Sequence, residues 1–177
     1  MASTPTQLMT FAEFEQLPDP RGGKYELRHG ELIFMAPPKQ GHRRIERSIE
    51  GLLTSAAGPA WVAVAELGFQ PEREHEYRIA DVALVSQLRW DAADPNGYYQ
   101  GSPDLVIEVL SPSNTASEMA DRRDLCLRTG AREFWLVDPD RRTVDVSTPD
   151  GHTLTHRSGS NIPLFCGGSL SLDEIFA

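Results

Sequence analysis

The chain has 177 residues, 40% of them hydrophobic, which is enough to bury the core of one domain and too few to promise a second, so we expect a single domain over residues 1–177. The chain has only two cysteines, which lie far apart and lack Cys-x-x-Cys spacing, so neither a disulfide framework nor a thiolate zinc site is indicated. Because we find no apolar run of the length of a signal peptide or a membrane span, we expect a cytoplasmic protein that contacts no membrane. The net charge of −9 argues against a nucleic-acid partner but does not exclude one, because cations bound at an acidic metal site would cancel part of it.

The first predicted elements are a short helix and a hairpin. Thr10 and Glu13 have the spacing of a capping box, which predicts a helix over Phe11–Leu17. Lys24–Leu27 and Glu31–Met35 then flank a connection that contains glycine and has hairpin length.

An amphipathic helix follows. Apolar residues recur at steps of three and four from Ile45 to Ala56, and Gly58 marks the end. One face of this helix should dock on a sheet, while the other carries arginines. Both arginine groups of the chain could instead be solvated helix faces; the first contains Arg43, Arg44 and Arg47, and the second Arg122, Arg123, Arg128 and Arg132.

The period then changes to that of strands. We predict strands at Trp61–Leu67, Arg78–Val85 and Asp104–Leu110. The last two are nearly continuous apolar runs, as expected of strands covered on both faces. Between them, the polar segment Ser86–Pro103 has the length of a loop that is functional or mobile.

The remaining elements complete a mixed sheet. A capping box at Thr115 begins a helix that ends at Gly130. Strands follow at Glu133–Val137, Thr143–Ser147 and Thr153–Arg157. The central order is therefore helix, three strands, helix, strand, with added hairpins, which predicts an α/β fold.

Two carboxylates stand out because they interrupt apolar strands. Asp81 and Glu108 would cost several kcal/mol to bury ionised unless a cation or hydrogen-bond donor compensates them. A shared magnesium or manganese ion would suit such oxygen ligands. Each carboxylate could instead cap a turn or pair with an arginine. An acid and base pair of the glycosidase type is disfavoured, since nothing else indicates an aromatic sugar cleft.

Five blocks of the chain, in this order, carry a family resemblance: Tyr25–Leu32, Pro37-Pro38 with His42, Asp81–Ala83, Pro103–Ser113 and Gly130–Pro139. They resemble the Uma-type restriction endonuclease family of the PD-(D/E)XK nuclease superfamily. The resemblance implies a restriction endonuclease-like mixed sheet with a helix-strand-strand-strand-helix-strand core. It also implies hydrolysis of phosphodiester bonds with Mg²⁺ or Mn²⁺ as cofactor.

The resemblance assigns roles to four residues. It implies that Asp81 and Glu108 hold the metal, with the backbone carbonyl of Val109 as a further ligand. The motif lysine would fall at Leu110, but in this family it comes from the following helix, where this chain has Arg122. Because the pKa of arginine is above about 12, Arg122 can stabilise phosphate charge but is a poor proton acceptor. We therefore expect slow, altered or absent catalysis. Ala80 also replaces the family's proline.

Two more positions match the family near its start. Glu26 could act on metal or water, although an exposed strand glutamate is the more common case. His42 could contact phosphate or metal, or could simply be hydrogen-bonded at the start of its helix. Asp104 is expected to satisfy turn amides, and Trp135 to belong to the core.

Two main functions remain open. The first is a magnesium-dependent endonuclease whose partner is DNA. The second is a catalytically weak or inactive nuclease fold that serves as a nucleic-acid-binding or protein-interaction module. A subunit that needs another chain is a third. A homodimer would suit cleavage of both strands.

Overall fold

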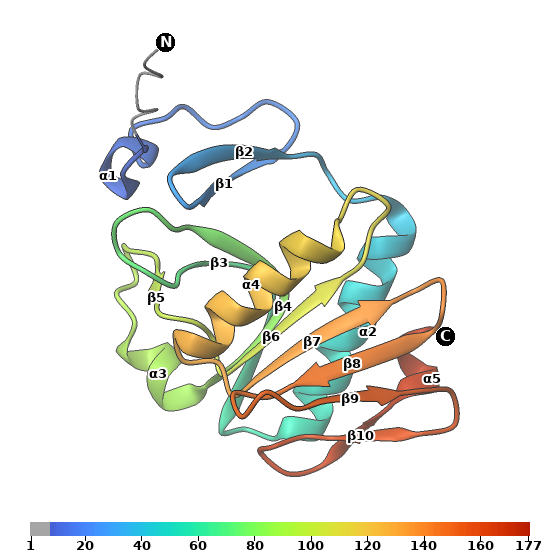
Figure 1. Cartoon of the computed structure of the whole chain (residues 1–177). Coiled ribbons are helices and arrows are strands. Elements are labelled where there is room, and N and C mark those ends of the chain that lie inside the picture. The colour runs from blue at the N-terminus through green and yellow to red at the C-terminus, as the bar shows by residue number, and fades with distance from the viewer. Residues whose placement is uncertain (1–7) are drawn as a thin grey trace.

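A seven-stranded mixed sheet forms the centre of the molecule, with strand order β5-β3-β4-β6-β7-β8-β9. The computed structural model describes residues 8–177; residues 1–7, where the sequence predicts no signal peptide, lie outside the described residues. Two long helices, α2 (Gln40–Ala57) and α4 (Ala116–Arg128), lie on opposite faces of this sheet (Figure 1). In the part of the chain that is described, no helix is long and apolar enough to cross a membrane.

The other elements have the following bounds. The short helices are α1 (Phe11–Phe14), α3 (Gln87–Ala92) and α5 (Leu172–Ile175). The strands are β1 (Lys24–Arg28), β2 (Glu31–Met35), β3 (Trp61–Gln70), β4 (Arg78–Ser86), β5 (Tyr99–Gln100), β6 (Leu105–Val109), β7 (Glu133–Asp138), β8 (Thr143–Ser147), β9 (Thr153–His156), β10 (Asn161–Pro163) and β11 (Ser169–Ser171).

The core has two layers because β4 and β6 are covered on both faces. Ile49 and Leu53 of α2 pack in one cluster with Val82 and Ile107. On the other face, Cys126 of α4 belongs to a separate cluster with strand residues that include Ala83, Val106 and Phe134. This arrangement confirms that the two apolar runs are buried strands, and Trp135 is fully buried as expected. Since alternate residues of a strand face opposite sides, each run serves both layers.

The predicted order of helix, three strands, helix and strand is confirmed by α2, β3, β4, β6, α4 and β7. The loop predicted over Ser86–Pro103 contains two short regular elements that were not predicted. The Ser86 hydroxyl accepts a hydrogen bond from the Arg89 amide and begins α3, and β5 then pairs in parallel with the end of β3.

Smaller differences concern the ends of the chain. The first helix stops at Phe14 instead of Leu17, and the last predicted strand stops at His156 instead of Arg157. The hairpin β10–β11 and helix α5 were not predicted. Elements of three or four residues are too short to display a hydrophobic period.

The β1–β2 hairpin is separate from the large sheet, and one backbone bridge joins it to the residue that precedes β4. Leu27 and Tyr77 exchange backbone hydrogen bonds of 2.9 Å. The hairpin turns at His29 and Gly30, which both have positive φ. This placement brings Glu26 of β1 beneath α4, towards the carboxylates of the sheet.

Candidate metal centre

Asp81 and Glu108 occupy neighbouring positions on paired strands. Strands β4 and β6 are antiparallel, and Val82 lies opposite Ile107, so the next position on each strand is Asp81 and Glu108. Side chains at such positions approach each other closely. The Val109 amide also donates to Asp81 Oδ2 over 2.7 Å, which fixes the aspartate against β6. The expectation that these two strands are adjacent is confirmed.

Glu108 is buried and shares a hydrogen bond with Arg122. Arg122 Nη1 lies 2.9 Å from Glu108 Oε1. Burial raises the pKa of Glu108 to about 8, and the negative charges of Asp81 and Glu26 add to this effect while Arg122 opposes it. A further positive charge beside Glu108 would therefore favour its ionised form.

Arg122 is as buried as the core residues, and both terminal nitrogens of its guanidinium donate hydrogen bonds. Nη1 also donates to the Ile79 carbonyl over 3.1 Å, and Nη2 donates to Glu26 Oε2. Burial alone would lower the pKa of Arg122, but the two glutamates outweigh it and raise this pKa further above its ordinary value. Arg122 is thus a permanent cation held between two carboxylates.

Glu26 is fully buried, so the expectation of an exposed strand glutamate was wrong. Its Oε1 accepts from the Ile79 amide over 2.8 Å, and its Oε2 accepts from Arg122 and from Arg28 Nε, the latter over 2.7 Å. Burial disfavours the charge, but the two arginines and the amide lower the pKa of Glu26 below its ordinary value. Both oxygens of Glu26 are therefore engaged, Oε2 with two arginines and Oε1 with a backbone amide.

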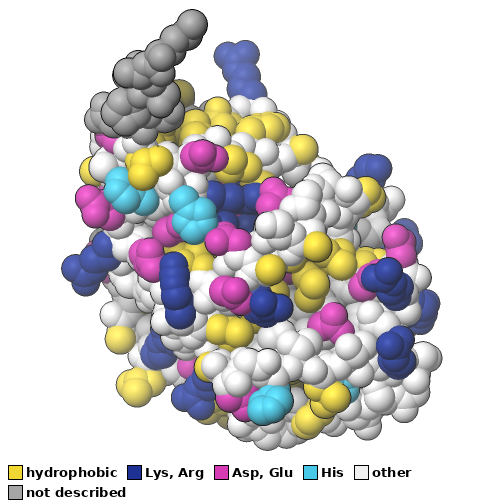
Figure 2. All heavy atoms as spheres, viewed as in Figure 1, with side chains coloured by type: hydrophobic (Ala, Val, Ile, Leu, Met, Phe, Trp, Pro, Cys, Tyr) yellow, Lys and Arg dark blue, Asp and Glu magenta, His cyan; other side chains and the backbone are white. Residues whose placement is uncertain are grey.

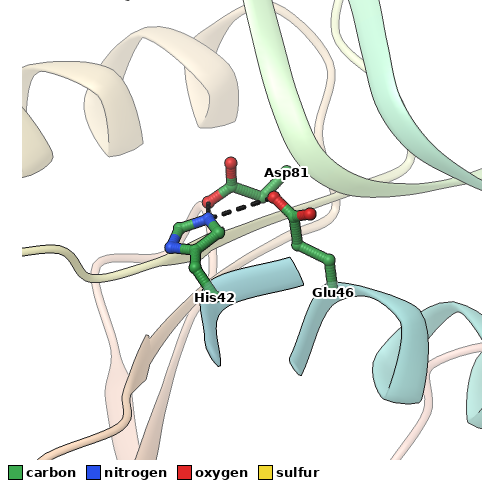
Figure 3. Close-up of side chains that lie close together, drawn as sticks. All are labelled: His42, Glu46 and Asp81. Atoms are coloured by element: carbon green, nitrogen blue, oxygen red, sulfur yellow. Dashed lines mark ion pairs between the residues drawn. The ribbon is translucent and has the colours of Figure 1, made fainter. Parts of the chain in front are cut away.

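His42 and Glu46 bring a third carboxylate to the centre from α2. His42 Nε2 lies 3.0 Å from Glu46 Oε1 and 3.3 Å from Asp81 Oδ2 (Figure 3). The ligand atoms of the three residues lie within 4.8 Å of one another. Burial opposes the charge of His42, but its hydrogen bonds to Asp81 and Glu46 raise the pKa of His42 to about 10. His42 is therefore a cationic bridge between two carboxylates.

Sequence reasoning did not find Glu46. Its side chain is buried on α2, one helical turn after His42 and next to the apolar stripe that contains Ile49. A carboxylate on the apolar face of an amphipathic helix, four residues from a histidine, was the signal that could have revealed it.

The second arginine group is not a free basic face. Arg122 is buried, and the other three arginines of the group pair with carboxylates: Arg123 with Asp124, Arg128 with Glu72 and Arg132 with Asp104. On the molecular face that carries α4, acidic and basic side chains are interspersed (Figure 2). Asp104 was expected to satisfy turn amides; it accepts from the Ser86 amide at the end of β4 over 3.2 Å and also pairs with Arg89.

The donor set fits a hard divalent cation. Within residues 8–177, Asp81 Oδ1 and Glu108 Oε2 have no hydrogen-bond or ion-pair partner, although the other oxygen of each carboxylate is engaged. Carboxylate oxygens are the ligands that magnesium and manganese prefer, and Glu46 lies near enough to Asp81 to add another.

Comparison with known proteins identifies the family. The sequence model of Uma2, described as "Putative restriction endonuclease", matches residues 11–165. The chain belongs to the Uma2 family. A crystal structure described as a putative nuclease belonging to DUF820, from Anabaena variabilis, is similar at 25% sequence identity with a TM-score of 0.81. The alignment covers 95% of this Uma2 chain and 97% of the other. No curated protein matches the chain.

Proposed function

We propose that this Uma2 protein is an endonuclease that hydrolyses phosphodiester bonds in DNA with Mg²⁺ or Mn²⁺. The observation that carries the proposal is the pair Asp81 and Glu108, at adjacent positions of two paired strands, each with one oxygen free within residues 8–177. Family membership supports a nuclease over other uses of paired carboxylates.

Asp81 and Glu108 would hold the cation through their free oxygens. When bound, the cation supplies polarisation of the scissile phosphate and a lower pKa for the attacking water. The Val109 amide keeps Asp81 in place, and Arg122 keeps Glu108 in place. His42 and Glu46 extend the centre on the α2 side, where they contribute a second carboxylate next to Asp81.

Arg122 is assigned an electrostatic role. Its guanidinium remains charged, so it adds positive potential beside the reacting phosphate and does not accept a proton from water. Glu26 orients Arg122 from the opposite side. We expect slower turnover than with a lysine at this position, and Arg122→Lys should enhance cleavage.

A second candidate is a nuclease-fold module that binds nucleic acid or protein without catalysis. The observation that favours it is the full engagement of Arg122, whose guanidinium donates to Glu26, Glu108 and the Ile79 carbonyl. Robust cleavage by the unmodified protein would exclude this candidate.

The test is nicking of supercoiled plasmid by purified protein with Mg²⁺, with Mn²⁺ and with chelator. Asp81→Asn and Glu108→Gln should each reduce the nicking rate by more than the roughly 10- to 100-fold that is typical when a hydrogen-bond partner of a metal ligand is replaced. Asp124→Asn is the matched control, because Asp124 is an exposed α4 carboxylate paired with Arg123. Cleavage that is equal in all four proteins would come from a contaminant and would contradict the proposal.

A further inference from the structure

Glu66 has an unusual backbone conformation directly beside the candidate centre. In the β3–β4 ladder, Ala65 lies opposite Val82 and Leu67 opposite Ala80, so Glu66 faces the position of Asp81. Its φ is 54°, in the left-handed region that residues with a side chain rarely adopt. Such conformations cost about 1–3 kcal/mol and persist where the surrounding structure enforces them.

The Glu66 carboxylate forms ion pairs with two cations from distant parts of the chain. Lys24 Nζ of β1 lies 3.2 Å from Glu66 Oε2, and Arg43 Nη2 of α2 lies 3.4 Å from Glu66 Oε1. The Lys24 and Arg43 side chains stay 44% and 48% exposed, so both can still contact a ligand. Lys39, at the start of α2, is exposed and has no ion-pair partner within residues 8–177. We call Lys24, Lys39, Arg43 and Glu66 the rim cluster.

Stability alone does not account for the rim cluster. Exposed ion pairs stabilise a fold by about 0–1 kcal/mol, which does not offset the strain at Glu66. Arg128 and Glu72 form an exposed pair of 2.9 Å at the far end of α4, and neither has a positive φ. The strained position therefore coincides with the place where cations border the candidate centre.

We propose that the rim cluster binds backbone phosphates of double-stranded DNA next to the scissile bond, with Glu66 as the residue that positions Lys24 and Arg43. This inference rests on the proposed function. Within the rim cluster, three cations outnumber the one carboxylate, although the Glu50 carboxylate lies beside it on the Ala65 amide. An anionic membrane fits less well, because Ile49 and Leu53 on the apolar face of α2 are fully buried and cannot insert.

The test is binding of a short fluorescein-labelled DNA duplex, measured by fluorescence anisotropy with Ca²⁺ in place of Mg²⁺ over a series of NaCl concentrations. Lys24→Gln/Arg43→Gln should raise Kd roughly fivefold to tenfold at about 0.1 M NaCl. The slope of log affinity against log salt should become shallower by about two, one for each phosphate that the variant no longer neutralises. Lys24→Arg/Arg43→Lys should restore most of the affinity.

The matched control is Arg73→Gln/Arg128→Gln, which removes two exposed arginines around the Glu72 pair. Unchanged affinity in this control, with an intact thermal transition in both double variants, supports the assignment. Four results would each overturn the assignment. Two concern the double variants: an equal loss of DNA affinity in both, or no loss in either. The other two are no duplex binding by the unmodified protein and tighter binding of an RNA duplex of the same sequence. If the plasmid is cleaved but the rim cluster is dispensable for binding, the rim proposal fails and the proposed function stands. If duplex binding depends on the rim cluster but no plasmid is cleaved, the rim proposal stands and the proposed function fails.

Discussion

Arg122 and Glu26 form a buried ion pair although 96 residues separate them in the chain. The contact joins helix α4 to the β1–β2 hairpin, whose other links to the body of the protein include the Leu27–Tyr77 backbone pair and the Ile79 amide on Glu26. The same guanidinium donates to Glu108, so Arg122 couples the hairpin to the orientation of a proposed metal ligand.

Arg122→Ala should destabilise the fold strongly, because it leaves Glu108 buried without its cation and Glu26 with Arg28 as its one remaining arginine. We expect a loss of about 3–5 kcal/mol in the free energy of unfolding, measured by urea denaturation. Arg123→Ala, at the exposed neighbouring position, should change it by less than about 0.5 kcal/mol. Similar values for the two variants would contradict the role of the buried network.

Acid stability should depend on Glu26. The pKa of Glu26 is lowered in the folded protein from an ordinary value of 4.5, so its contribution is complete above pH 4.5 and is lost as the pH falls through the folded pKa. Glu26→Gln should lower stability at neutral pH and flatten the decline below pH 4.5. The measurement is the free energy of unfolding against pH for both proteins. Two parallel curves would show that Glu26 does not make this contribution.

The strain at Glu66 can be measured directly. Glycine adopts positive φ without a steric penalty, whereas alanine incurs that penalty. Both substitutions remove the contacts with Lys24 and Arg43, so Glu66→Gly should be more stable than Glu66→Ala by about 1 kcal/mol. Thermal or urea unfolding gives the difference. An alanine variant as stable as the glycine variant would mean that the left-handed conformation is not imposed on residue 66.

The two cysteines should react differently with a thiol reagent. Cys126 is fully buried, and burial raises the pKa of its thiol to about 12, whereas Cys166 is partly exposed. The native protein should therefore react with Ellman's reagent at one thiol and the unfolded protein at two. Cys166→Ser should abolish the native reaction, and rapid labelling of Cys126 would contradict the packing of α4 on the sheet.

Local patterns predicted the central fold because its elements are long enough to show a period. The capping box at Thr115 and the apolar runs around Asp81 and Glu108 each carried their own signal. Strand β5 has only two residues and pairs with a strand formed much earlier in the chain, so nothing local marked it.

The candidate centre was predictable only in part. Asp81 and Glu108 were visible because a charge in an apolar strand is costly. The burial of Glu26 was not, because its stabilising partner Arg122 lies far along the chain. The helix sequence marked Glu46 as a carboxylate on an apolar face, but its nearness to Asp81 depends on how α2 packs against β4, which no local pattern gives.

The central claim is that Asp81 and Glu108 hold a divalent cation, and isothermal titration of the metal-free protein with Mn²⁺ tests it most directly. The unmodified protein should bind Mn²⁺ at a defined stoichiometry, Asp124→Asn should bind equally, and Asp81→Asn/Glu108→Gln should not bind. No binding by the unmodified protein, or equal binding by the double variant, would contradict the claim.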